Sequence, residues 1–183
     1  MPYSVAPCSE IPVIETTRLR LRRHRVEDFG ACTAMWADPV VTRFIGGQPA
    51  SAHQVWERLL KYAGLWSLLG FGYWALEERG SGRYVGELGF AEFMREIDPP
   101  IQGTPELGWA LVTAAHGRGY ATEAVGAALA WGEQRFGADS RTVCMISPDN
   151  LASIRVATKC GFRAARLTHY GAESVMLYTR GAS

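Results

Sequence analysis

The sequence has no excess of either charge and no long apolar run. Of its 183 residues, 19 are Lys or Arg and 18 are Asp or Glu, so the formal net charge is +1. This balance argues against nucleic acid or a membrane surface as a partner. The most apolar window, residues 59–76, contains Lys61 and several glycines, so it does not predict a membrane span. The first ten residues, MPYSVAPCSE, lack a basic start and an apolar core, so we expect no signal peptide.

Patterns typical of metal sites and disulfide frameworks are also missing. The four cysteines form no C-x-x-C pair and have no histidine at zinc spacing: Cys8, Cys32, Cys144 and Cys160. We therefore expect no metal site, and reduced thiols in a cytoplasmic protein. Cys160 lies on the apolar face of a short predicted helix, which favours a packed thiol over a nucleophile. His24 shows no pairing pattern, which favours a surface or capping role.

Apolar periodicity predicts seven strands and four helices. The strands are residues 17–22, 73–78, 84–93, 106–112, 142–146, 162–169 and 174–179; the helices are residues 26–36, 51–69, 120–136 and 150–160. This order predicts an α/β (α+β) fold, with a mostly antiparallel central sheet and helices on both faces. Because the helix 120–136 is a crossover between two strands, those strands should be parallel neighbours.

Individual elements carry further expectations. Alternation in the strand 106–112 places Leu107 on one face and Glu106 on the other. In the helix 51–69, Trp56 and Leu60 are expected on the buried face. The tryptophans are expected in the core or in the wall of an acceptor cleft: Trp36, Trp56, Trp66 and Trp74.

Residues 116–125, HGRGYATEAV, place two glycines directly before a predicted helix. The first turn of a helix has backbone N–H groups without partners and a partial positive charge, so it can bind a phosphate. Glycine lets those N–H groups approach an anion closely, although Gly117 and Gly119 are also typical of a plain tight turn. The dinucleotide fingerprint fails because Thr122 replaces its third glycine, and no G-K-[ST] sequence supports a P-loop.

His116-Gly117-Arg118-Gly119-Tyr120-Ala121 resembles the Q/R-x-x-G-x-G/A motif of the GNAT N-acetyltransferase superfamily. TTRLRLR, EDF, VGELGF, ELGWAL and the N-x-x-S…K-x-G-F pattern of residues 150–162 are similar to other family elements in the same order. The opening segments resemble the branch that acetylates ribosomal-protein N-termini. The resemblance implies one domain over residues 1–183, with residues 1–13 as a loose extension. It also implies that the strands 106–112 and 142–146, the family's β4/β5 pair, splay apart.

The resemblance further implies acetyl-CoA as co-substrate, a protein N-terminus or a small molecule as amine acceptor, and a monomer or homodimer. Its pantetheine arm would lie between the splayed strands like an added strand, with an N–H near Ala110 or Leu111 polarising the thioester. The donor site would be formed by Leu111, Val112, His116, Gly117, Arg118, Gly119, Tyr120, Ala121, Thr122 and Asn150. Two positions depart from the family: His116 replaces glutamine or arginine, and Ala157 stands where many relatives have a tyrosine.

The candidate catalytic residues are Glu106, Glu87 and Ser153. Glu106 is the first choice for general base because the family often has an acid at the start of that strand, and Glu87 is the second. Either acid is otherwise a solvated strand residue, Ser153 a first-turn helix residue, and Asn150 an N-cap. An acyl-CoA sensor without turnover is the alternative function, motivated by the missing tyrosine.

Overall fold

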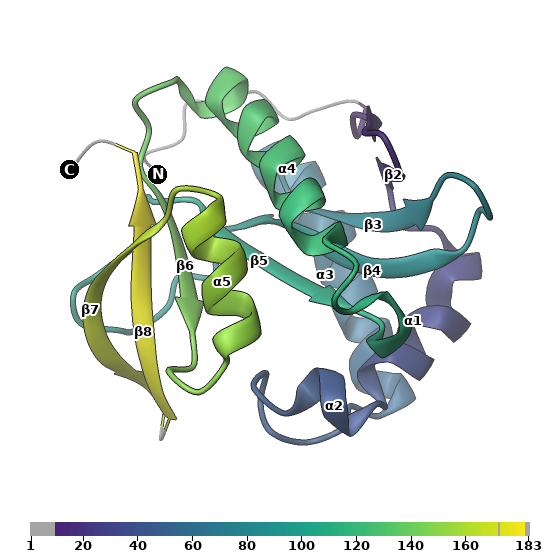
Figure 1. Cartoon of the computed structure of the whole chain (residues 1–183), viewed down its shortest axis with the longest axis horizontal. Helices are drawn as coiled ribbons and strands as arrows, with labels where there is room; N and C mark the ends of the chain where they lie inside the picture. Colours follow the sequence, from purple (N-terminus) through teal and green to yellow (C-terminus); the bar gives the residue numbers. More distant parts are fainter. Residues whose placement is uncertain (1–9, 172, 182–183) are drawn as a thin grey trace.

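The computed structural model describes residues 10–171 and 173–181, which form one eight-stranded sheet in the order β1-β2-β3-β4-β5-β6-β8-β7 (Figure 1). The strands are β1 (Ile14–Glu15), β2 (Leu19–Arg22), β3 (Tyr73–Glu78), β4 (Tyr84–Ala91), β5 (Glu106–Leu111), β6 (Thr142–Ile146), β7 (Arg163–Tyr170) and β8 (Glu173–Arg180). All neighbouring pairs are antiparallel except β5 and β6, which are parallel. The mixed, mostly antiparallel sheet and the parallel pair confirm the prediction.

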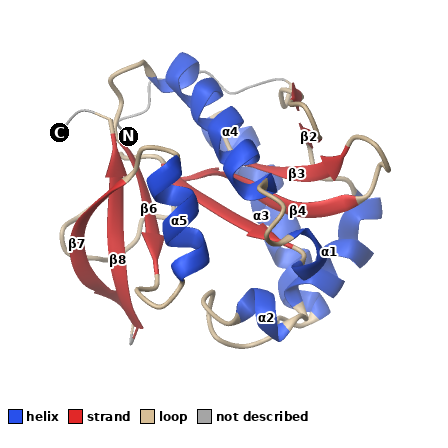
Figure 2. Ribbon diagram, viewed as in Figure 1, coloured by secondary structure: helices blue, strands red, loops and turns tan. Residues whose placement is uncertain are grey.

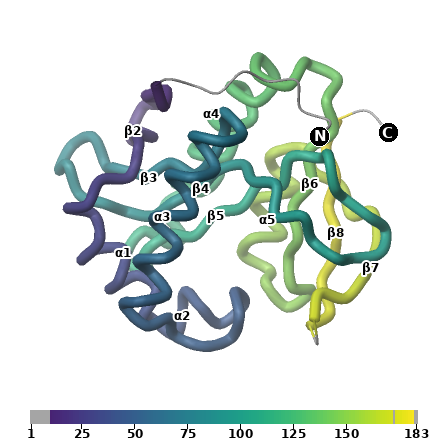
Figure 3. Tube along the Cα trace, turned by 180° about the vertical axis from the view of Figure 1, so that it is seen from behind, coloured from purple at the N-terminus to yellow at the C-terminus, as the bar shows by residue number. Residues whose placement is uncertain are grey.

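The helices lie on both faces of the sheet. They are α1 (Phe29–Trp36), α2 (Pro39–Thr42), α3 (Ala52–Leu69), α4 (Tyr120–Phe136) and α5 (Leu151–Lys159), with 3-10 turns at Val26–Asp28 and Thr113–Ala115. Helices α4 and α5 cover the face turned toward the viewer in Figure 2, and α3 crosses the opposite face in Figure 3. Helices α1 and α3 share an apolar cluster with β3, β4 and β5.

The two faces of β5 follow the predicted alternation. Leu107 and Leu111 pack in the cluster beneath α4, whereas Ala110 packs beneath α1 and α3. Glu106 and Glu87 lie on this second face, because β5 and β4 pair in the register that opposes Glu87 to Ala110 and Glu106 to Ala91. The alternation therefore sends the carboxylates toward α1 and α3.

The sheet divides between β5 and β6. Glu106 and Val143 are the one residue pair that joins these strands in the described part of the chain. Beyond that pair the strands diverge, so β1–β5 and β6–β8 form two halves of the sheet (Figure 2). The predicted splay is confirmed, and it lies directly before the glycine turn.

Several boundaries differ from the expectations. The first helix begins with a 3-10 turn, and Pro39 starts α2, because proline fits the first helical position and Asp38 caps the helix by accepting from the Val40 N–H. Of the expected loose extension, residues 1–9 lie outside the described residues, whereas the Pro12 carbonyl accepts a hydrogen bond from Trp74. No helix in residues 10–171 and 173–181 is long and apolar enough to cross a membrane.

Candidate active site

The glycine turn, residues 116–119, has the backbone that an anion site requires. Gly117 and Gly119 have φ values of +71° and +78°, in the left-handed region where side chains are disfavoured. Gly119 is the N-cap of α4 and has no side-chain cap. Within the described residues, the N–H groups of residues 117–122 donate no backbone hydrogen bond. These free donors at a helix N-terminus suit a diphosphate.

Side chains fasten the glycine turn to the β3–β4 hairpin. Arg118 forms an ion pair with Glu78 at 2.9 Å, and the Tyr120 hydroxyl donates to the same carboxylate at 2.5 Å. Hydrogen bonds from Ser81, Tyr120 and Arg83 lower the pKa of Glu78 to about 2. Arg18 donates to the Arg118 carbonyl at 2.8 Å. The Arg118 guanidinium is thus held against Glu78, and the backbone N–H groups of Tyr120 and Ala121 donate no backbone hydrogen bond within the described residues.

His116 closes the end of β5. Its Nε2 lies 2.9 Å from the Leu111 carbonyl oxygen. A carbonyl only accepts hydrogen bonds, so Nε2 carries the proton. The imidazole therefore orients the segment from Leu111 through Val112 to the glycine turn.

The backbone of β5 offers alternate groups to the gap between β5 and β6. The Val112 N–H donates to the Val85 carbonyl of the neighbouring segment, so the Ala110 N–H also faces β4. The N–H groups of Trp109 and Leu111 then face the gap, where β6 does not pair with them. Of the two donors expected near the thioester, Leu111 therefore faces the gap whereas Ala110 faces β4, and Trp109 is a further N–H on the gap side.

The start of α5 lines the other side of this gap. Asn150 is an N-cap, as predicted, and its side-chain oxygen accepts from the Ser153 N–H at 3.1 Å. This leaves the Asn150 amide nitrogen for a further partner. Ala157, where many relatives have a tyrosine, is fully buried between α5 and the core. Cys160 is packed against the Thr122 carbonyl, as predicted.

One cavity of about 700 Å³ connects the gap with the chamber beneath α1 and α3. On the gap side it is lined by residues 107–110 and 144–147 with Asn150 and Ser153. On the other side, which we call the acceptor chamber, it is lined by Trp36, Arg58, Lys61, Tyr62, Tyr73, Glu87, Phe93, Arg95 and Glu106. A larger hollow of about 880 Å³ lies at the outer start of α5, but none of the candidate acids lines it. The smaller cavity is therefore the candidate active site.

Glu106 is held by one cation. Arg95 donates to both of its carboxylate oxygens, at 2.6 and 2.8 Å. Arg95 also stacks over the rings of Phe93 and Tyr170, at 4.7 and 4.5 Å from their centroids. Each carboxylate oxygen of Glu106 thus accepts one hydrogen bond from Arg95 and can accept another from a group in the cavity that Glu106 lines. Because Glu106 pairs with Val143 where β5 and β6 meet, it lies at the closed end of the gap.

Glu87 is more completely bonded. Its Oε1 accepts from the Tyr62 hydroxyl and from the Trp36 indole at 3.2 Å, and its Oε2 accepts from the Tyr84 hydroxyl at 3.1 Å. Burial opposes ionisation, but His24 and the Tyr62 hydroxyl outweigh it and lower the pKa of Glu87. The His24 Nε2 lies 3.6 Å away, too far for a hydrogen bond, so its effect is electrostatic when the ring is protonated.

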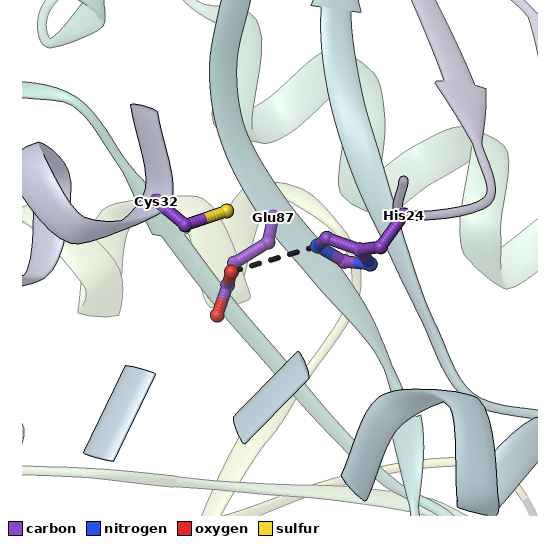
Figure 4. A group of neighbouring side chains, drawn as sticks. All are labelled: His24, Cys32 and Glu87. Atoms are coloured by element: carbon purple, nitrogen blue, oxygen red, sulfur yellow. Dashed lines mark ion pairs between the residues drawn. The ribbon is translucent and has the colours of Figure 1, made fainter. Parts of the chain in front are cut away.

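His24, Cys32 and Glu87 form the one described cluster whose donor atoms could hold a metal ion (Figure 4). Burial raises the pKa of the Cys32 thiol to about 12, so it stays protonated and is a poor ligand. The Glu87 oxygens are already occupied by three hydrogen bonds. Glu87 is therefore better explained as the hydrogen-bond acceptor of Trp36, Tyr62 and Tyr84 than as a metal ligand. His24 is buried beside Glu87, so the expected surface or capping role is wrong.

The cavity contains residues that no sequence pattern singled out. Arg58, Lys61 and Tyr62 come from α3, Arg95 from the β4–β5 loop and Tyr73 from β3. Tyr73 stacks on Tyr62 with centroids 4.4 Å apart. A Cβ at Gly108 would lie 2.3 Å from the Tyr73 hydroxyl, so that hydroxyl reaches β5 midway along its length. The spacing of Arg58, Lys61 and Tyr62 on one helix face was the available signal.

Comparison with known proteins gives a consistent result. Residues 18–163 match the model of the acetyltransferase (GNAT) domain family. The uncharacterized N-acetyltransferase YoaA of Bacillus subtilis is 27% identical over 153 residues, 83% of each chain. An acetyltransferase from Agrobacterium tumefaciens is 27% identical with a TM-score of 0.79, covering 93% of this chain and 95% of its own. RimL, an alpha-N-protein acetyltransferase of ribosomal L7/L12 solved with coenzyme A, shares the fold at 19% identity and a TM-score of 0.70, covering 93% of this chain and 98% of its own.

Proposed function

Because this chain belongs to the GNAT acetyltransferase family, an acyltransferase family that uses acetyl-CoA as co-substrate, we propose that its acceptor is a primary amine. The amine belongs to a small molecule or to a protein N-terminus. One observation carries the proposal: a single cavity joins the β5–β6 gap to a chamber that contains Glu87 and Glu106. The N-acetyltransferase name of the Bacillus relative supports an amine acceptor. The sensor alternative receives no support from these comparisons.

The donor site is formed by the glycine turn and the gap. The free N–H groups of residues 117–122 bind the diphosphate, and a side chain at Gly117 or Gly119 would require a strained backbone. The gap-facing groups of Trp109 and Leu111 bind the extended arm as a neighbouring strand would. The bound co-substrate supplies an acetyl group activated as a thioester.

Glu106 is placed to receive the proton of the attacking amine. It lies roughly 17 Å along β5 from Leu111, so β5 extends from the segment before the glycine turn to the Glu106–Val143 pair. The reacting end lies toward this pair, where each Glu106 oxygen can accept a further hydrogen bond. Glu87 accepts three hydrogen bonds from buried side chains, and holds Tyr62 and Tyr84 in place. We therefore assign Glu106 as the base and Glu87 as a positioning residue.

Departure of the thiolate needs little help. A thiol has a pKa of about 8.5, so its thiolate leaves readily near neutral pH. The hydroxyls of Ser153 and Tyr73 border the cavity and are the candidates for a proton donor, in place of a tyrosine at Ala157. An α-amino group with a pKa of about 8 loses its proton far more easily than a lysine at about 10.4. A single base held by Arg95 therefore favours an N-terminal or small-molecule amine.

A thiol-release assay with acetyl-CoA and a panel of amines tests the function. We expect Glu106→Gln to lower kcat by about 10²-fold or more while the coenzyme A affinity stays within a few-fold of wild type. Glu57→Gln, which removes an exposed acid from α3, is the matched control. Unchanged kcat in Glu106→Gln at saturating amine would exclude Glu106 as the base. Tight donor binding with no thiol release from any amine would support the sensor instead.

A further inference from the structure

Two cations of the acceptor chamber, Arg58 and Lys61, lie beyond ion-pair distance of any carboxylate in the described part of the chain. Among the described residues, neither Arg58 nor Lys61 forms an ion pair. The third cation of the chamber, Arg95, is paired with Glu106 through two hydrogen bonds. Arg58 and Lys61 are therefore the basic groups available to a ligand.

Arg58 is held in place by aromatic groups. Its guanidinium carbon lies 3.8 Å from the centroid of the Trp36 ring. Its Nη1 makes a long contact of 3.4 Å with the Tyr62 hydroxyl, and its buried Nε has no hydrogen-bond partner in residues 10–171 and 173–181. Stacking fixes the plane of the guanidinium without consuming its donors. A fixed plane with open donors is the geometry that binds a planar carboxylate.

Lys61 lies one helical turn from Arg58, on the same face of α3. Its Nζ lies 4.9 Å from the centroid of the Phe93 ring. Burial lowers the pKa of Lys61, and the positive charges of Arg58 and Arg95 lower it further. The Glu87 and Glu106 carboxylates act in the opposite direction, but among the described residues neither forms an ion pair with Arg58 or Lys61.

We propose that the acceptor carries a carboxylate as well as its amine, and that Arg58 and Lys61 bind that carboxylate. This inference rests on the proposed N-acetyltransferase function and narrows its substrate to amino-acid-type molecules. With the carboxylate at α3, the amine points across the chamber toward the gap and Glu106. The aromatic walls of Trp36 and Phe93 suit an apolar side chain on the same molecule.

The first test compares matched acceptors on the wild-type protein. Each free amino acid is assayed beside its carboxamide and its decarboxylated amine, at saturating acetyl-CoA, by thiol release. We expect kcat/KM to be about ten- to a hundredfold higher for the free carboxylate, the range of one charged hydrogen bond. Equal kcat/KM for acid and amide would overturn the carboxylate subsite and leave the acetyltransferase intact. Absence of turnover with every amine would instead count against the proposed function.

The second test locates the preference in the two side chains. Arg58→Gln and Lys61→Met should each lower kcat/KM for the free acid by about tenfold or more and leave the value for the amide nearly unchanged. Arg23→Gln, an exposed arginine outside the cavity, is the control. Thermal unfolding and coenzyme A affinity report whether each variant is folded. A folded Arg58→Gln and a folded Lys61→Met that both keep the wild-type preference for the acid would refute the assignment.

Discussion

The conformation of Gly119 provides the sharpest test of the donor site. Gly119 has φ +78°, and a Cβ there would meet only the Arg18 Nη2 at 3.5 Å, an ordinary contact. A side chain is therefore opposed by the backbone conformation and not by a clash. A left-handed conformation costs a non-glycine residue roughly 1–2 kcal/mol, and a β-branched residue is a genuine outlier there. Gly119→Val should thus force the peptides of the glycine turn to rotate.

The expected loss of affinity follows from the donors involved. Rotation of the turn would remove at least two N–H groups from a bound diphosphate, each worth about 1.5–3 kcal/mol as a charged hydrogen bond. Since 1.4 kcal/mol is tenfold in Kd, coenzyme A should bind at least about 100-fold more weakly. The strain should lower Tm by only about 2–8 °C for a domain of this size.

The matched control is Gly126→Val. Gly126 lies inside α4 without a positive φ, and a Cβ there would meet nothing within 4 Å. Its Tm and its Kd for coenzyme A should stay near wild type, because valine and glycine differ little in helix propensity. Titration calorimetry with coenzyme A and thermal unfolding measure both quantities. A folded Gly119→Val that binds coenzyme A as tightly as Gly126→Val would refute the phosphate role of the turn.

Three further outcomes are expected. Glu87→Gln should lower the free energy of unfolding by about 1–3 kcal/mol at pH 7, because it leaves buried donors unsatisfied. Since the pKa of Glu87 is lowered from 4.5, the difference in Tm between variant and wild type should shrink as the pH falls below 4.5. A difference in Tm that stays constant with pH would contradict this assignment. Gly89→Ala should lower Tm by several degrees, because its Cβ would lie 2.2 Å from the Gly72 carbonyl oxygen. Gly64→Ala is the control and should not lower Tm, because its Cβ would meet nothing within 4 Å. Equal Tm values for the two variants would show that the strand can move aside. Burial raises the thiol pKa values of Cys32 and Cys144, so neither thiol should react with a thiol reagent at pH 8 until the protein unfolds. Peptide mapping that finds either cysteine labelled in the native state would refute their burial.

The long periodic segments of the sequence were sufficient to predict most of the fold. Helix α4 was anticipated because small apolar residues mark one face over its whole length. Strand β1 and helix α2 were missed, since two and four residues are too short to show a period. The buried face of α3 was partly wrong: Trp56 and Leu60 are 38% and 56% exposed. Apolar residues occur around much of that helix, so their type alone does not select the face.

The candidate site divides in the same way. The glycine turn could be predicted because two glycines separated by one residue, directly before a helix, are a local property of the chain. The acceptor chamber could not, because Trp36, Arg58 and Glu87 come from α1, α3 and β4 and meet only after the sheet and the helices have packed. A sequence does not distinguish an arginine without an ion pair from one that has a partner, or a carboxylate that accepts three hydrogen bonds from one that accepts none. The chemical roles of such residues depend on which neighbours the fold brings to them.

The single pair at Glu106–Val143 joins the two halves of the sheet at one end of β5, and the halves diverge from that pair toward the glycine turn. The Glu106–Val143 pair lies beside the assigned base, and the glycine turn follows the opposite end of β5. A small rotation of one half of the sheet about this pair would change the distance between β5 and β6 much more near the glycine turn than beside Glu106. In the proposed donor site, the width of the gap is therefore fixed most firmly beside Glu106, the assigned base.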